Sequence, residues 1–343
     1  MTYPNPEVEK IRVMAAQSMG MPLDVRYTGD LVIVILLSCI YGINLLATLF
    51  VLINRNYPPI RSKGPLILVV MYISSACWFI GDLQVNGHVT LVNSSLTDCR
   101  GYGFWVRILL GVCNITGLIS IRAYIFYRIF VRNLPARGFR FFLPIGTFFA
   151  CLLAIGIVIS VLSPSKSVEY VPHLDLCSMD KPLKITIYVL LWVMDGFTSV
   201  ITWRNRNIKS SFRELREMVF SLVIMFTALI FNTAMQFAHP YYPFKSKYRI
   251  ASTIFDTAAC NAIWWGIMAK PFFQCVFRRQ QYLHEWMTKL CEDGLQKEYQ
   301  VSSSQAMYAN QDGNMDQYKE VPEVKDSNSI QTTGSRMSFR YGN

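Results

Sequence analysis

Long apolar segments, separated by short loops rich in Lys and Arg, are the feature that most constrains how this chain folds. A segment of about 20 apolar residues is long enough to cross the hydrocarbon core of a bilayer as a helix. The chain is 52% hydrophobic and only 16% charged, whereas soluble domains carry about 25% charged residues. The sequence therefore predicts an all-α membrane protein.

The apolar segments predict a seven-transmembrane helix bundle. We expect the spans at Leu31–Ile53, Pro65–Val85, Tyr102–Phe130, Phe139–Leu162, Ile185–Trp203, Met218–Ala238 and Ile250–Phe277. Residues 1–30 carry scattered charges and lack the apolar centre of a cleavable signal peptide, so we expect insertion to begin at the first span. With the amino terminus outside, as the loop charges below indicate, residues 1–30 form an extracellular segment. After the bundle (31–277) we expect an amphipathic membrane-surface helix (278–292) and a disordered cytoplasmic tail (293–343) with few aliphatic residues.

The distribution of Lys and Arg between the loops predicts that the amino terminus lies outside. Twelve of these cations follow the first, third and fifth spans, and seven follow the second, fourth and sixth. Loops with the excess normally face the cytoplasm. In this topology Asn93, which opens an Asn-Ser-Ser glycosylation sequence, lies outside. The formal net charge of +11 then reflects membrane topology, and we expect no nucleic acid as a partner.

Two cysteines, Cys99 and Cys177, lie outside the spans on the predicted outer face. Both face the oxidising side of the membrane, where disulfides persist. A bridge between them would tie the loop after the fourth span to the start of the third. We expect this disulfide, with two unrelated free thiols as the alternative.

Ionisable residues inside the spans identify candidate sites, because each costs about 2.5 to 3.5 kcal/mol on insertion scales. Asp82, Arg107, Gln236 and Asp256 lie within about three turns of the predicted outer face, where a ligand pocket could open. Mutual pairing, for example of Asp82 with Arg107, is the alternative. Arg122 and Asp195 lie deeper, and the buried Arg122 needs a carboxylate partner.

Three short segments resemble the transmembrane domain of class C G-protein-coupled receptors, in the same order and at the same helix ends. They are Arg122-Ala-Tyr-Ile-Phe-Tyr-Arg128-Ile-Phe130, Phe212-Arg-Glu214-Leu-Arg216 and Met268-Ala-Lys270-Pro271. Without the large ectodomain of that glutamate-receptor family, the expected architecture is also similar to divergent fungal seven-helix receptors.

The resemblance implies an ionic lock between Arg122 and Glu214 that holds the resting state. Asp195 is the competing partner of Arg122. It also implies that the cytoplasmic helix ends face a heterotrimeric G protein, through Arg128, Phe130, Arg132, Phe212, Arg216 and Lys270. The function expected is therefore that of a receptor and signal transducer in the plasma membrane.

The region after the last span predicts attachment to the inner leaflet. Tyr282, Leu283, Trp286, Met287 and Leu290 recur at helical spacing between polar residues, as in helices that lie on a membrane surface. Cys275 and Cys291 flank this helix and are candidate palmitoylation sites.

Other functions find less support in the sequence. The four histidines, His88, His173, His239 and His284, lie outside the spans, so we expect no metal site, no cofactor and no enzyme. A transporter or carrier of a small solute is the alternative function, but internal repeats typical of many transporters are not visible. We expect as partners an extracellular ligand, a G protein and membrane lipid; a homodimer remains open.

Overall fold

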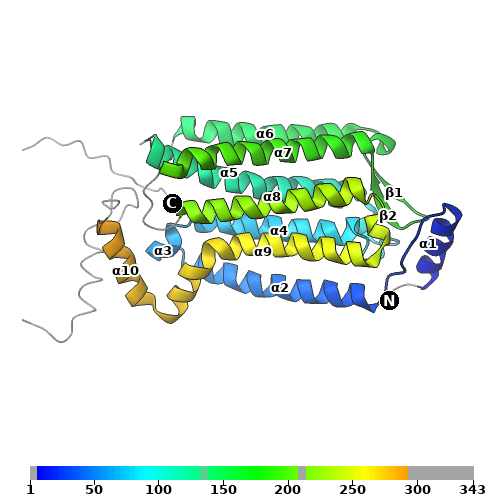
Figure 1. The fold of residues 1–343 in the computed structure, drawn as a ribbon, viewed down its shortest axis with the longest axis horizontal. Helices are drawn as coiled ribbons and strands as arrows, with labels where there is room; N and C mark the ends of the chain where they lie inside the picture. The colour runs from blue at the N-terminus through cyan, green and yellow to red at the C-terminus, as the bar shows by residue number, and fades with distance from the viewer. Residues whose placement is uncertain (1–5, 133, 135, 137, 208–213, 293–343) are drawn as a thin grey trace, which may run out of the picture. The chain divides into compact units, whose positions relative to one another are not determined.

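The computed structural model describes residues 6–132, 134, 136, 138–207 and 214–292, which are mostly helical (Figure 1). Six of the helices are long and apolar enough to cross a membrane. They are α2 (Thr28–Ile53), α4 (Pro65–Val85), the continuous helix Arg100–Val131, α6 (Phe139–Val161), α7 (Lys181–Arg204) and α8 (Glu214–Ala238). Apart from one short hairpin, the described chain is thus an all-α, multi-pass membrane protein.

A further long helix, α9 (Ser246–Phe277), packs in the same bundle against α8, α4 and α2. It covers the segment that the sequence predicts as a seventh span. By length and composition it is not among the six, because polar residues such as Asp256 and Asn261 lower the hydropathy of its sequence.

The third long helix changes its hydrogen bonding along its length. Its first part, Arg100–Cys113, is π-helical, its middle is α5 (Asn114–Phe126), and its last turn, Tyr127–Val131, is again π-helical. In a π-helix the backbone hydrogen bonds join residues five apart. Such helices are rare overall, but a large share of those known lie at functional sites. The wide π-helical part lies beside α4.

Two glycines allow α4 and the π-helical part to approach closely. A Cβ atom on Gly81 would lie 2.8 Å from the Cα of Arg107, and one on Gly111 would lie 3.0 Å from the Cα of Trp78. Because such distances are shorter than a side chain tolerates, glycine is required at both contacts. The close contact brings Arg107 beside Asp82 on α4.

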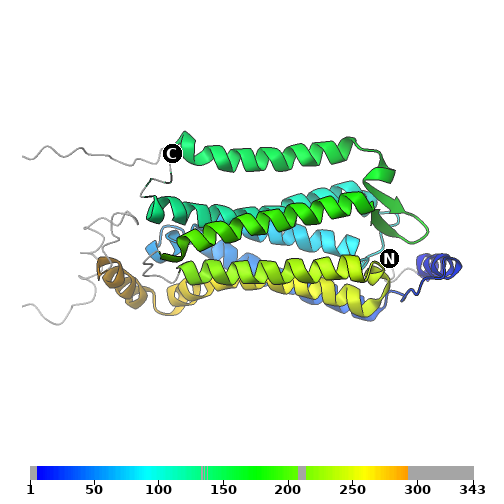
Figure 2. The same cartoon turned by 45° about the horizontal axis from the view of Figure 1, so that its top comes forward.

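The remaining helices pack in neighbouring pairs, α8 with α9, α5 with α7, and α7 with α8. At the edge of the bundle lies α6 (Figure 2), which packs against the π-helical part of the third helix. Within its apolar 18-residue stretch, only 17% of the residues are buried inside the bundle. The outward-facing side of α6 therefore needs an apolar solvent.

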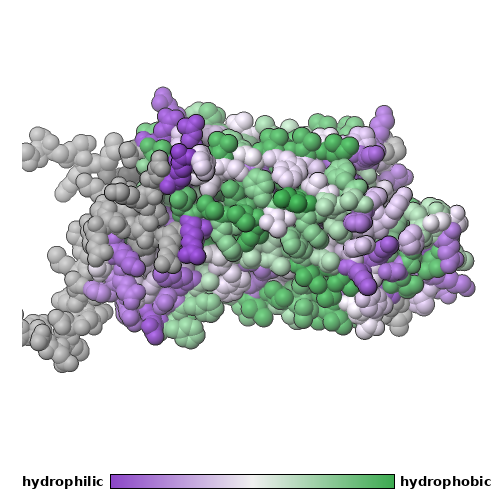
Figure 3. All heavy atoms as spheres, in the orientation of Figure 1, coloured by the Kyte–Doolittle hydropathy of each residue, from purple (hydrophilic) through white to green (hydrophobic). Residues whose placement is uncertain are grey.

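Large apolar side chains cover the outside of the bundle. Leu46, Ile53, Val161 and Val193 are among those at least 64% exposed. On the face seen in Figure 3, a broad hydrophobic zone lies between two ends that carry hydrophilic residues. A soluble protein rarely exposes so much contiguous apolar surface, so this zone matches the hydrocarbon layer of a membrane.

The two ends of the bundle carry different short elements. We call one the disulfide end; it carries α1 (Pro6–Ser18) and an antiparallel hairpin of β1 (Val168–Val171) and β2 (Leu176–Met179). We call the other the α10 end; it carries α3 (Pro58–Arg61) and α10 (Arg279–Glu292). Short 3-10 turns lie at Ser95–Thr97, Pro164–Lys166, Asn205–Asn207 and Tyr242–Phe244.

Candidate functional site

A cavity of about 300 Å³ opens inside the bundle toward the disulfide end. Its walls come from the third helix, α4, α7, α8 and β2, and residues near Met21 and Phe244 line its outer end. Most of the lining is apolar. Cavities of this size and composition, with a few polar groups, are typical of small-molecule sites.

One face of α7 supplies polar and charged groups to the cavity. Lys184, Tyr188, Leu191 and Asp195 all line it, and their spacing places them on one side of a helix. Asp195 is only 2% exposed. The cavity therefore runs along α7 from a cation near the disulfide end to a carboxylate farther inside the bundle.

Arg107 also lines the cavity, but its charge is already paired. Its Nε donates to Oδ1 of Asp82 at 2.6 Å, as the pairing alternative predicted. Asp256 accepts a hydrogen bond of 2.6 Å from Nδ2 of Asn232, another lining residue. Of the four predicted ligand-pocket residues, Arg107 and Gln236 line the cavity. Asp82 and Asp256 lie behind its wall, where they accept hydrogen bonds from the lining residues Arg107 and Asn232.

A chain of buried hydrogen bonds leads from the cavity wall to α9. It joins, in order, the side chains of Gln236, Tyr242, Asn86, Thr253, His88, Asp30 and Arg249. Burial raises the pKa of Tyr242 to about 12, so its hydroxyl keeps its proton at neutral pH and donates to Asn86. Such a satisfied buried network rigidifies the helices that it connects.

The amino-terminal segment is fastened to the disulfide end by buried ion pairs. Arg26 contacts Asp175 at 2.7 Å and Glu9 at 3.3 Å, and Arg12 contacts Glu9 at 2.8 Å. An apolar cluster of Ala16, Leu174 and Phe244 packs beside them. The sequence predicted neither α1 nor this cluster, because the scattered charges of residues 1–30 are typical of a solvent-exposed segment.

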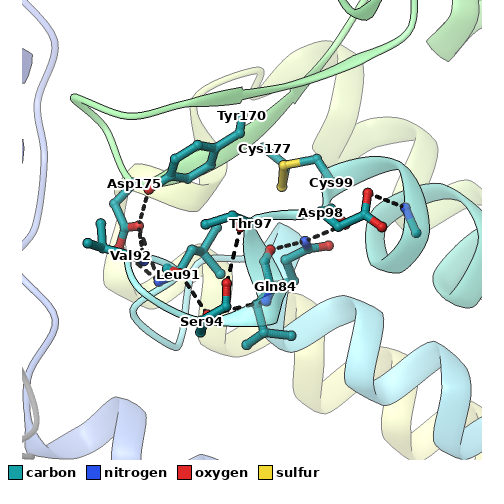
Figure 4. The surroundings of a disulfide bond; sticks show 12 residues. Gln84, Leu91, Val92, Ser94, Thr97, Asp98, Cys99, Tyr170, Asp175 and Cys177 are labelled. Carbon is teal, nitrogen blue, oxygen red and sulfur yellow. Dashed lines mark hydrogen bonds between the residues drawn. A yellow bond between two sulfur atoms is a disulfide. The ribbon is translucent and has the colours of Figure 1, made fainter.

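The predicted disulfide between Cys99 and Cys177 is confirmed, with the two Cα atoms 5.6 Å apart (Figure 4). It joins β2 to the start of the third helix. Beside it, Asp175 accepts hydrogen bonds from the backbone N–H groups of Leu91 and Val92 and from the hydroxyl of Tyr170. Asn93 lies exposed in the same loop.

An ionic cluster joins three parts of the chain toward the α10 end. Nη2 of Arg122 on α5 donates to Glu217 on α8 at 2.9 Å, and Nζ of Lys63 donates to the same carboxylate at 2.7 Å. Arg122 and Lys63 have side chains only 7% exposed. We call these three residues the inner ionic cluster.

The carboxylate that Arg122 contacts thus differs from the expected one. Glu217 makes the contact expected of Glu214, because the two residues lie three apart on one face of α8 and Glu217 lies deeper along the helix. Oε1 of Glu214 lies 4.0 Å from Nζ of Lys63. Asp195, the alternative partner, lines the cavity instead.

The residues expected to face a G protein lie in several environments. Arg132, Arg216 and Lys270 are exposed. Arg128 donates to the carbonyl oxygen of Arg140 at 2.8 Å, and Phe130 packs against Ala123 and its neighbours. Phe212 lies outside the described residues, as does the tail 293–343.

The helix predicted over 278–292 is present as α10, but it uses part of its apolar face within the protein. Tyr282 and Leu283 pack against the main apolar cluster, and Leu290 is fully buried. The thiol of Cys275 is also buried, with 5% exposure, so it is not presented for palmitoylation as expected. The side chain of Cys291 is not described.

Some residues of the site have signals in the sequence that could have been used. Tyr188 and Asp195 share one face of the span predicted at Ile185–Trp203, and Lys184, one residue before that span, continues the same helical spacing. Glu217 lies three residues after Glu214 and follows the same basic segment of the sequence. No signal in the sequence distinguishes the two carboxylates, because their depths differ by less than one helical turn.

Among the described residues, no group of three metal-ligating side chains is found. No family model matches the chain, and a search of curated proteins found no match.

Proposed function

We propose that this protein is a seven-helix receptor of the G-protein-coupled type, with α9 as the seventh crossing. The disulfide end faces outward, α10 lies at the inner leaflet, and a ligand in the cavity changes the affinity of the α10 end for a heterotrimeric G protein. The class-C-like segments at the helix ends support this proposal, as does the two-ended layout of the bundle.

One observation carries the proposal: the same two helices line the cavity and hold the inner ionic cluster. On α5, Thr116 lines the cavity and Arg122 lies six residues later. On α8, Met225 lines the cavity and Glu217 lies eight residues earlier. At about 1.5 Å per residue, these separations are roughly 9 and 12 Å. A ligand that moves α5 against α8 therefore acts directly on the Arg122–Glu217 pair.

The pair can serve as the element with two states. Breaking a buried or partly buried ion pair leaves charges without compensation, which is costly in the resting arrangement. A ligand favours the other arrangement only by binding to it more tightly. The free energy of that difference, typically 1 to 3 kcal/mol, is the coupling between the two sites.

The topology also has support from chemistry at the two ends. A disulfide persists on the oxidising side of a membrane, and Asn93, in the loop beside it, is exposed for glycosylation. The opposite end carries the exposed cations Arg132, Arg216 and Lys270, as expected of a cytoplasmic face.

The test is nucleotide exchange on purified G-protein α subunits, presented as heterotrimers to the protein in lipid nanodiscs. Glu217→Gln removes the charge that Arg122 and Lys63 share. If the pair holds the resting state by about 1 kcal/mol, basal exchange should rise about fivefold. Glu285→Gln is the matched control, because Glu285 is an exposed carboxylate on α10 that accepts only from Gln281 among the described side chains.

Unchanged basal exchange in Glu217→Gln, with the variant folded and the wild type active, would remove the pair from the mechanism. Absence of exchange with every class of α subunit, together with concentrative uptake of a solute into vesicles, would favour the carrier function instead.

A further inference from the structure

The cavity contains a buried carboxylate that none of the described side chains compensates. Asp195 is 2% exposed and lines the cavity. No hydrogen bond or ion pair to its side chain is found in the described part of the chain. The other two charged groups of the lining differ from it, because Arg107 is paired with Asp82 and Lys184 is a cation.

The surroundings of Asp195 supply little to stabilise a negative charge. The hydroxyl of Thr116, which lies on α5 in the cavity lining, already donates to the carbonyl oxygen of Val112 at 3.0 Å. Thr198, one turn along α7, donates to Met194 at 2.8 Å. A carboxylate in such an apolar site needs a cation or a donor from elsewhere.

At the other end of the same wall lies an ammonium group that is also without a partner among the described side chains. Lys184 is half-buried and lies eleven residues before Asp195. At about 1.5 Å per residue, the two Cα atoms are roughly 16 Å apart along α7. Between them the wall is mostly apolar, with Ile187 and Leu191 on α7 and Leu229 on α8. The hydroxyl of Tyr188, which also lies between them, donates to the carbonyl oxygen of Asn232.

We infer that the cavity takes an elongated ligand with an ammonium group at one end, an apolar body, and an anionic group at the other end. The ammonium group pairs with Asp195, and the anionic group pairs with Lys184. Each charged group of the cavity wall that lacks a partner then gains one, and the apolar residues between them are covered. This names the ligand class of the proposed receptor and in that sense rests on the proposed function.

The two ends contribute differently. The ammonium group lies deep, among residues of α5 and α8 that lead to the inner ionic cluster, so pairing with Asp195 is the contact that reaches the moving helices. The anionic end lies near the disulfide end, where Lys184 and the hairpin line the mouth, and it fixes the orientation of the ligand.

The test uses a series of ω-amino acids, namely those of octanoic, decanoic and dodecanoic acid, with the unaminated acids as matched probes. Binding to the purified full-length protein in nanodiscs is measured by the concentration dependence of its thermal unfolding, because a ligand stabilises the state that it binds. Asp195→Asn and Lys184→Gln keep side-chain size and remove one charge each. Glu169→Gln is the control, because Glu169 is exposed on β1.

We expect saturable stabilisation of the wild type and of Glu169→Gln by at least one ω-amino acid. Affinity should fall about tenfold or more in Asp195→Asn and in Lys184→Gln, as expected for a lost charge-assisted contact. The inference is overturned if no ω-amino acid binds, if the unaminated acids bind as tightly, or if Asp195→Asn keeps the wild-type affinity. Because binding is measured without a G protein, this experiment tests the ligand class independently of the receptor function.

Discussion

Nη1 of Arg26 donates to Oδ2 of Asp175 over 2.7 Å, which joins the amino-terminal segment to the hairpin that the disulfide also holds. The same guanidinium donates from Nε to the carbonyl oxygen of Gly87 at 2.8 Å. Arg26 therefore connects three chain segments that the sequence separates by up to 149 residues. Its side chain has no exposed surface.

Replacement of Arg26 by Met should release the amino-terminal segment. The change leaves the buried carboxylates of Glu9 and Asp175 with fewer partners, and breaking a buried pair costs about 3 to 5 kcal/mol. Hydrogen exchange over α1 should rise together with a fall in the unfolding temperature. Lys10→Met, at an exposed site on the same helix, should change neither. Equal exchange in the two variants would show that the ion pairs do not hold the segment.

Loss of the disulfide should destabilise the protein by about 2 to 4 kcal/mol, the usual range for a native bridge. Thermal unfolding with and without reductant measures this effect. Reductant should lower the unfolding temperature of the wild type but not that of a Cys99→Ser, Cys177→Ser variant. Cys39→Ser, at an exposed free cysteine, is the control and should keep the response of the wild type.

An alanine at Gly81 should force α4 and the third helix apart. Its Cβ would meet the backbone of Arg107, and overpacking of this kind costs about 1 to 3 kcal/mol. Gly42→Ala is the matched control on α2, where nothing lies within 4 Å of the added Cβ. The unfolding temperature should fall in the first variant only; a fall of the same size in both would mean that helix packing is not its cause.

Stability should decrease in strongly alkaline solution through Tyr242. Burial raises its pKa from 10.0 to about 12, so between these values the folded state binds more protons than the unfolded state. The stabilising contribution is therefore complete below about pH 10 and is lost as the pH rises toward 12.

Unfolding measured against pH checks the sign of this effect. The stability advantage of the wild type over Tyr242→Phe should shrink by about 3 kcal/mol in all as the pH rises from below 10 to above 12, at 1.36 kcal/mol per pKa unit. Tyr241→Phe, at a residue that is 54% exposed, should follow the wild type. A constant difference between wild type and Tyr242→Phe would contradict the assignment.

The sequence predicts the helices well, because each is set by a long apolar run. The second span, predicted at Pro65–Val85, has these bounds in the structure, where Gly64 with a positive φ of 71° precedes the first proline. The first span begins three residues earlier than expected, at Thr28. The sequence places Asp30 just before the predicted span because it is charged. In the structure it lies within α2, where it is fully buried and paired with Arg249.

The site is less predictable, since it depends on which side chains meet across helices. Arg107 with Asp82 was one of the alternatives, and the structure selects it. Asp195 was the alternative partner of Arg122, but it lines the cavity, because depth alone does not tell which way a side chain on α7 faces. The amino-terminal helix and its ion pairs depend on contacts with residues up to 162 positions away, which no local pattern reveals.

The π-helical part of the third helix also decides how this chain can be aligned with others. A π-turn accommodates one more residue than the α-turn that it replaces, so a gapless alignment drifts along Arg100–Cys113. Neither end of the helix gives an undisturbed count, because Arg107 lies within the first π-helical part and the second, Tyr127–Val131, lies between Arg122 and the α10 end. An alignment with a third helix that is α-helical throughout therefore needs a gap within Arg100–Cys113, level with the cavity that Arg107 and Val112 line.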